Sequence, residues 1–259
     1  MKIATWNING IKARLEHLIL WLKENQPDIV CLQEIKSINE KFPRGPIESL
    51  GYHVETHGQK GLNGVALLSR DIPNQINHGL PGDPSDHQSR FIEGIYSTKN
   101  GIIRIASLYA PNGNPAPGNK FLYKISWMKR LYEFAKNRLL DRDPLILAGD
   151  YNVIPTNYDA KNPNKWNKDA LALPQTRNIF QRLIQLGFTD AIRALSSSPE
   201  YTFWEYQAMA WKKDDGIRID HLLISPEAFQ KLESGFTQKE IRGWEKTSDH
   251  VPVWIELNI

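Results

Sequence analysis

Polar side chains end several apolar, strand-like segments of this 259-residue chain, and their types suit one shared site. They are Asn7, Glu34, Asp150, Asn152, Asp249 and His250. Gathering several carboxylates in one place is costly unless a cation neutralises them. A set that is rich in oxygen and has no cysteine cluster favours a hard divalent ion such as Mg²⁺. The pattern therefore predicts a metal-assisted enzyme.

The elements that must carry these side chains alternate between short apolar strands and amphipathic helices. We expect strands over residues 2–7, 29–33, 64–70, 91–97, 102–109, 145–148, 201–206, 218–224 and 251–257. Helices are expected over 11–24, 120–140 and 175–186, the second with apolar positions Leu122, Ile125, Met128, Leu131 and Ala135. Two segments, 111–119 and 151–173, are expected to be long loops, which in compact domains are usually functional.

The proportion of these elements predicts the fold. Strands outnumber helices, and glycine, proline and asparagine turns separate many of them at hairpin-like spacing. The sheets should therefore be largely mixed or antiparallel. Two sheets packed face to face with helices outside account for both the short strands and the amphipathic helices. We predict an α/β protein, a four-layer α/β/β/α sandwich, with one catalytic domain over residues 1–259.

Composition narrows the class of protein. The formal charge of +3 and the sequence pI of about 8.8 are compatible with a polyanionic partner, and equally with an ordinary surface. Cys31, the single cysteine, stands in an apolar run and is expected to be a buried thiol. The first expected strand begins almost at Met1, and no apolar run approaches the length of a membrane span. We therefore expect no signal peptide and no membrane helix, with the cytoplasm as the default location.

Seven short motifs follow one another in an order that resembles the exonuclease III family of abasic-site endonucleases, within the endonuclease/exonuclease/phosphatase superfamily. The resemblance covers essentially the whole chain. The motifs are Trp6-Asn-Ile-Asn-Gly10, Leu32-Gln-Glu-Ile-Lys36, Gly64-Val-Ala-Leu-Leu68, Tyr109-Ala-Pro-Asn112, Ala148-Gly-Asp-Tyr-Asn152, Gly216-Ile-Arg-Ile-Asp220 and Ser248-Asp-His250. Any one of them is a weak signal, whereas seven in the same order leave little room for coincidence.

Phosphodiester hydrolysis needs a nucleophilic water, stabilisation of the phosphoryl oxygens and help for the leaving alkoxide. Asp150 and Asn152 bracket one residue, so in an extended segment they project to the same side. Asp150 could then take a proton from water while the Asn152 amide donates to the phosphate. The alternative is a turn in which both satisfy local backbone groups. Asp249 points away from its neighbour His250, and ligation of a metal, directly or through water, is its natural use.

The resemblance implies further roles. Glu34 matches the principal metal ligand of the family, Asp220 the partner of the histidine, and Tyr109 a donor to the phosphate. Asn7 could ligate the metal or orient a carboxylate. The expected DNA contacts and the expected abasic pocket comprise Lys36, Arg90, Asn112, Phe203, Ile217 and Ile219.

The resemblance thus implies a monomeric nuclease that uses Mg²⁺, with Mn²⁺ as a substitute. It would cut duplex DNA on the 5′ side of abasic sites and act on blocked 3′ ends as a 3′–5′ exonuclease or end-cleaning enzyme. The nearest alternative keeps the fold and metal but changes the substrate, as in a nonspecific nuclease or a small-molecule phosphoesterase. An inactive DNA-binding or scaffold module is the alternative from another class. It is disfavoured because the acidic, amide and histidine residues of the motifs are all present.

Overall fold

Two six-stranded sheets pack face to face in the computed structural model, which describes residues 1–259. The first sheet has the order β11-β12-β1-β2-β4-β3. Its strands are Leu232–Thr237, Val253–Leu257, Lys2–Asn7, Ile29–Gln33, Val65–Ser69 and His53–His57. The second sheet has the order β5-β6-β7-β8-β10-β9. Its strands are Gln75–His78, Phe91–Thr98, Gly101–Tyr109, Leu145–Asp150, Asp220–Ile224 and Thr189–Asp190.

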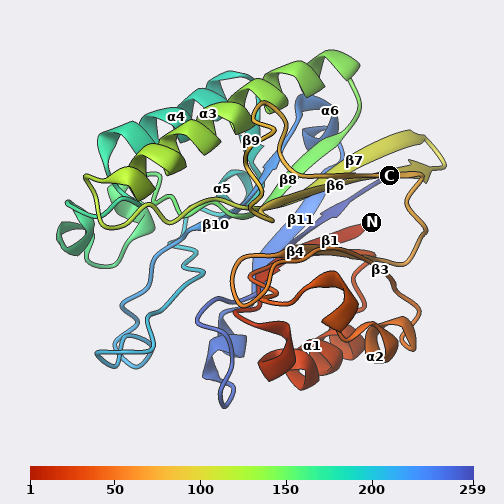
Figure 1. Cartoon of the computed structure of the whole chain (residues 1–259), viewed down its shortest axis with the longest axis horizontal. Coiled ribbons are helices and arrows are strands. Elements are labelled where there is room, and N and C mark those ends of the chain that lie inside the picture. The colour runs from red at the N-terminus through yellow and green to blue at the C-terminus, as the bar shows by residue number, and fades with distance from the viewer.

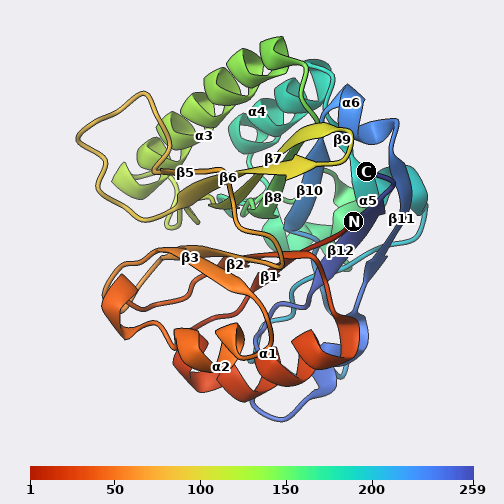
Figure 2. The ribbon, with the colours of Figure 1, turned by 90° about the vertical axis from the view of Figure 1, so that its right-hand side faces the viewer.

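Helices cover the outer faces of both sheets (Figure 1, Figure 2). Helices α1 (Ile11–Asn25) and α2 (Arg44–Glu48) lie outside the first sheet, and α3 (Asn119–Arg138) and α4 (Pro174–Gln185) outside the second. Two shorter helices, α5 (Ala191–Leu195) and α6 (Pro226–Phe229), flank the strand β10. The predicted four-layer sandwich is therefore confirmed. None of the helices combines the length and apolar content that a membrane span would need.

Side-chain alternation along the strands builds the core between the sheets. In β1, Ala4 and Trp6 pack towards α1, whereas Ile3 packs between the sheets. In β2, Val30 and Leu32 face α1, and Cys31 lies in the intersheet core, fully buried as expected. The same alternation applies in the second sheet, so each strand adjacent to the site carries one row of side chains into the space between the sheets.

Strand directions bring the ends of these rows to one edge. The pairs β1–β2 and β7–β8 are parallel, and the other pairs are antiparallel, as the mixed-sheet prediction requires. Strand β10 runs opposite to β8, and its first residue, Asp220, stands directly across from Asp150, the last residue of β8. The first residue of β10 therefore lies at the same edge as the last residues of β1, β2 and β8.

Several sequence predictions were wrong or incomplete. Residues 201–206 form no strand, and Phe203 makes only isolated bridges, to Ile217 and to His250. Leu122 is 67% exposed, because the buried face of α3 is turned to Trp127, Leu131 and Phe134. The short strands β5, β9 and β11 and the helices α2, α5 and α6 were not predicted. The loop before α3 and the loop after β8 are irregular as expected, the second with two 3₁₀ turns, Asn157–Asp159 and Pro163–Trp166.

Candidate active site

The intersheet rows end in polar side chains at the edge where the strands stop. Asn7 continues the inward row of β1 that begins with Ile3, and Asp150 ends the inward row of β8. Asp220 begins the inward row of β10. All three are almost fully buried, with exposed fractions of 0% for Asn7 and 1% for each aspartate. The rows that form the apolar core therefore also set the positions of these side chains.

The Asn7 carboxamide bridges two carboxylates from opposite sheets. Its Nδ2 donates to Glu34 Oε1 and to Asp150 Oδ2, both at 2.9 Å. Its oxygen instead accepts from the backbone N–H of Asn9 at 3.1 Å. In this arrangement the Asn7 carboxamide orients the Glu34 and Asp150 carboxylates.

Glu34 follows β2 in a left-handed backbone conformation (φ 50°), which turns its carboxylate towards Asn7. Burial alone would raise its pKa, but the hydrogen bond from Asn7 and the nearby Lys36 cation lower it below the ordinary value. The Lys36 ammonium lies 2.9 Å from Glu34 Oε2 and also donates to Asn9 Oδ1. The Glu34 side chain is therefore held as a carboxylate.

A divalent ion fits the residues that meet here. One ligand atom from each of Glu34, Asp150 and His250 lies within 4.8 Å of the others. Two of these ligand atoms are carboxylate oxygens, which suit a hard cation. Within the protein, both carboxylates accept hydrogen bonds from the same Asn7 amide nitrogen. Asp249, also expected as a ligand, is occupied differently: its Oδ1 accepts from Asn9 Nδ2 at 3.0 Å. The donor set thus centres on Glu34 and Asp150.

His250 and Asp220 form a buried pair. His250 Nδ1 lies 2.8 Å from Asp220 Oδ2, and Nε2 lies 3.8 Å from Asp150 Oδ2. Burial alone would lower the pKa of His250, but the Asp220 carboxylate, reinforced by Asp150 and Asp249, raises it to about 10. The ring is fixed further by the edge-to-face contact with Phe203, at 4.9 Å between centroids. This arrangement favours an imidazolium whose Nε2 faces the site.

Asp150 and Asn152 meet through a local turn. Burial raises the pKa of Asp150 to about 7, although the His250 charge opposes the rise. The backbone N–H of Asn152 donates to Asp150 Oδ1 at 2.8 Å, and Asn152 itself has φ 49°. One N–H of its side-chain amide donates to Ala110 O at 2.9 Å, which leaves the second for another acceptor. The local turn considered as the alternative is therefore present, and both side chains also line the same cavity.

Several of the side chains described above line one cavity of about 260 Å³, and Asn7, Lys36 and Asp220 lie outside its lining. The polar lining contains Glu34, Tyr109, Asn112, Asn114, Asp150, Asn152, Asp169, Glu205, Asp249 and His250. The apolar wall contains Trp166, Leu171, Phe203 and Ile219. Ile217, predicted as a pocket residue, does not line this cavity: it is 1% exposed and packs in the apolar cluster behind it.

The expected DNA contacts divide into exposed and buried side chains. Asn112 is exposed, lines the cavity and donates from Nδ2 to Asn152 Oδ1 at 3.2 Å. Arg90 is 9% exposed, donates to Tyr109 O and stacks on the Tyr109 ring at 4.7 Å, so the structure places it behind the cavity wall. Burial, together with the Glu34 and Asp150 charges, raises the pKa of Tyr109 far above its usual value, which keeps its hydroxyl protonated.

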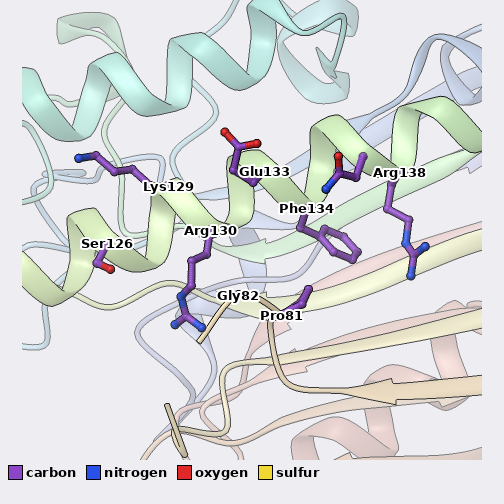
Figure 3. A pocket seen from close by; sticks show the side chains of 9 residues that line it. Pro81, Gly82, Ser126, Lys129, Arg130, Glu133, Phe134 and Arg138 are labelled. Atoms are coloured by element: carbon purple, nitrogen blue, oxygen red, sulfur yellow. The ribbon is translucent and has the colours of Figure 1, made fainter. Parts of the chain in front are cut away.

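Sequence reasoning missed the cavity residues of the two long loops, among them Asn114, Trp166 and Asp169. Irregular segments carry no periodicity that could assign their side chains, and only the loop lengths pointed to them. A second hollow, of about 510 Å³, lies on α3 (Figure 3). Two of its cations, Arg130 and Arg138, are paired with Asp86 and Glu93.

Comparisons with known proteins agree with this geometry. Residues 4–250 match the Endonuclease/Exonuclease/phosphatase family. The chain is 34% identical to exodeoxyribonuclease III of Haemophilus influenzae, covering 99% of this chain and all of that protein. An AP endonuclease structure from Archaeoglobus fulgidus superposes with a TM-score of 0.94 at 34% identity, and a 3′ phosphatase from Neisseria bound to a product DNA hairpin superposes with 0.94 at 35% identity. Both superpositions cover the whole of each chain. This chain therefore belongs to the endonuclease/exonuclease/phosphatase family and is one of its divalent-metal-dependent phosphodiesterases.

Proposed function

We propose that this protein hydrolyses the phosphodiester on the 5′ side of abasic sites in duplex DNA. We also propose companion activity on 3′ ends, as a 3′–5′ exonuclease and in the removal of 3′ blocking groups. The observation that carries the proposal is the meeting of Glu34 and Asp150, from opposite sheets, beside the His250–Asp220 pair. Those groups supply a cation site, a proton acceptor and a cationic donor within one cavity.

Mg²⁺, with Mn²⁺ as a substitute, is the ion we propose, because the two available carboxylates offer oxygen ligands. Glu34 and Asp150 would hold it, with Asn7 fixing their orientation. Asp249 and Asn152 would contribute through water or through the hydrogen bonds that they make around the cavity. When bound, the ion would neutralise charge on the phosphoryl oxygens and on the leaving oxygen.

The protein's own groups would move the proton and hold the phosphate. Asp150 would accept a proton from the attacking water, beside the cation site that it shares with Glu34. The free N–H of the Asn152 amide would donate to a phosphate oxygen. His250, charged and held by Asp220, would donate from Nε2 to a second one. The Tyr109 hydroxyl, which also lines the cavity, would remain a neutral donor.

Selectivity would come from the apolar wall. A sugar that lacks its base could lie against Phe203 and Ile219, whereas a base attached to that sugar would clash with the same apolar wall. Extrusion from the helix is also least costly where stacking is already lost. Lys36 and Asn112 would contact the backbone of the DNA, and Arg90 would act from behind through Tyr109. The superposed AP endonuclease and 3′ phosphatase structures support both proposed activities.

Two further expectations belong to this proposal. The whole of residues 1–259 would act as one catalytic unit, because the site takes side chains from both sheets. A monomer in the cytoplasm remains our prediction from the sequence.

A duplex with one abasic-site analogue tests the function directly. The protein should nick the labelled strand 5′ to the analogue and leave a 3′-hydroxyl, and EDTA should abolish the reaction. An intact duplex, a 3′-phosphorylated duplex and an inositol phosphate should be assayed alongside. Cleavage of intact and abasic duplex at equal rates would indicate a nonspecific nuclease. Hydrolysis of the inositol phosphate alone would indicate a small-molecule phosphoesterase, and binding without hydrolysis of any substrate would indicate an inactive module.

A further inference from the structure

One lysine of helix α3 carries its charge inside the protein. Lys124 has an exposed fraction of 0% and lies on a helix face whose other buried members include Trp127, Met128 and Leu131. Its ammonium donates to the main-chain oxygen of Asn112 at 3.0 Å and to that of Asn152 at a shorter distance. The charges of Asp150 and Asp169 act on it through space. The partners in hydrogen-bond contact with Nζ are thus two neutral carbonyls.

Folding alone does not account for a lysine at this position. Burying an ammonium without a contacting carboxylate costs several kcal/mol, whereas a methionine of similar length would fill the space without a buried charge. Burial accordingly lowers the pKa of Lys124 to about 7, against the opposing effect of the two aspartates. The groups that receive its hydrogen bonds therefore have to explain its presence.

Both acceptors belong to the irregular segments that carry side chains into the cavity. Asn112 lies in the loop before α3, and Asn152 begins the loop after β8. Their carboxamides meet at 3.2 Å, and both line the cavity. A Cβ on Gly113 would stand 2.6 Å from Lys124 Cδ, so a glycine here permits the loop to lie against the lysine stem. One buried cation thus joins the backbones of two residues that no regular element holds.

We propose that Lys124 is a positioning residue that holds the Asn112 and Asn152 carboxamides at the reaction cavity from behind. This inference rests on the proposed function, in which those amides face the phosphate. Without the ammonium, two buried carbonyls lose a charge-assisted donor, and both loops are free to shift. A displacement of about 1 Å in groups that contact the reacting phosphate costs up to about 10²-fold in rate.

The first test replaces Lys124 by methionine, with Lys129→Met as the matched control. Lys129 lies on the exposed side of the same helix, beside the hollow drawn in Figure 3. In single-turnover cleavage of an abasic duplex, Lys124→Met should lower kcat by about 10- to 100-fold, as misplaced groups do. KM should change much less. The protein should stay folded, because removal of a buried charge offsets the cost of two carbonyls that lose their donor. The control should match wild type. Equal kcat in the two variants would overturn the proposal.

A double-mutant cycle with Asn152→Ala separates positioning from a general loss of structure. If Lys124 acts through the Asn152 amide, adding Lys124→Met to Asn152→Ala should lower kcat by less than threefold further. Fully multiplicative losses in the double mutant would contradict positioning. If Lys124→Met unfolds, Lys124→Arg serves in its place, because it keeps a cation at this position. A folded Lys124→Arg variant without activity would contradict positioning as well.

A measurement that needs no substrate keeps this inference distinct from the proposed function. The side-chain amide resonances of Asn112 and Asn152 can be followed in ¹H–¹⁵N spectra of the free protein. Lys124→Met should shift both and broaden them, while the Asn100 amide, on an exposed turn, should not move. If wild type fails to cut abasic DNA but the two resonances shift as expected, the function fails and the positioning stands. If wild type cuts abasic DNA but the two resonances do not shift in Lys124→Met, the proposed function stands and the positioning role of Lys124 is wrong.

Discussion

Removing the charge of Asp220 gives the sharpest test of the proposed chemistry. Asp220→Asn keeps the size of the side chain and an oxygen that can accept from His250 Nδ1, now 2.8 Å from Asp220 Oδ2. The substitution removes the negative charge that contributes most to stabilising the protonated His250 ring. Because burial opposes the charged ring, His250 should then titrate near or below its ordinary value, in contrast to about 10 in the wild type. Each pKa unit lost corresponds to about 1.4 kcal/mol, so the imidazolium loses several kcal/mol of stabilisation.

Both rate and stability should follow that loss. Removing one preorganised donor to a developing oxyanion typically lowers kcat by about 10²–10³-fold. A histidine whose pKa is raised by folding contributes stability that is complete below its unfolded value and is lost as pH rises through its folded value. For His250 the window runs from about 6.5 to about 10. The stability difference between wild type and Asp220→Asn should therefore be largest below pH 6.5 and should shrink across this window.

The assay combines cleavage kinetics with titration of the ring. Single-turnover rates on an abasic duplex should be measured from pH 6 to 9, and the His250 ring signals followed in metal-free protein. The variant should lose activity towards alkaline pH earlier than wild type, and His250→Asn combined with Asp220→Asn should cost little more than either alone. A variant that keeps kcat within threefold of wild type, or whose His250 stays protonated above pH 9, would refute the reasoning.

Three other changes probe the rest of the site. Glu34→Ala should abolish cleavage and the rise in melting temperature that Mg²⁺ gives the wild type, measured by thermal melts with and without the ion, while Glu48→Gln on α2 should keep both. Asp150→Asn should lower the single-turnover rate by about 10²–10⁴-fold with affinity for abasic duplex retained; a loss under threefold would exclude it as the base. Phe203→Ala should reduce the ratio of abasic to intact cleavage, whereas Ile217→Ala, behind the wall, should lower stability and leave that ratio unchanged.

The strands that carry the site were predictable because their sequences are apolar and end in polar residues. Strands β1 and β2 have the predicted bounds, and β8 was predicted to within two residues of its end. Strands that are buried on both faces are almost uniformly apolar, so a short continuous apolar run is enough to recognise them. The strands β5 and β11 lie at sheet edges, where exposed and buried residues alternate weakly, and this removes the signal.

The side chains missed from the sequence depend on contacts between segments far apart. The apolar residues around 122–135 predicted a helix correctly, but its buried face includes Lys124 and excludes Leu122. No periodicity assigns a lysine to a core, because its burial depends on two carbonyls contributed by other segments. Residues 201–206 were predicted as a strand because they include several aromatic side chains. Of these, Phe203 lines the cavity and contacts His250, whereas Trp204 packs in the core on the α1 side of the first sheet.

The acidic residues of the site differ in what neutralises them, and this difference connects folding with chemistry. Asp220 has His250, and Asp249 has the Asn9 amide. Glu34 and Asp150 share the Asn7 amide, which donates to one oxygen of each. The Lys36 ammonium lies 2.9 Å from Glu34 Oε2, and His250 Nε2 lies 3.8 Å from Asp150 Oδ2. Those two carboxylates come from opposite sheets, so a cation between them would neutralise the site and join the sheets at the same point. The two carboxylates that the Asn7 amide holds together across the sheets are therefore the ones that metal binding would use.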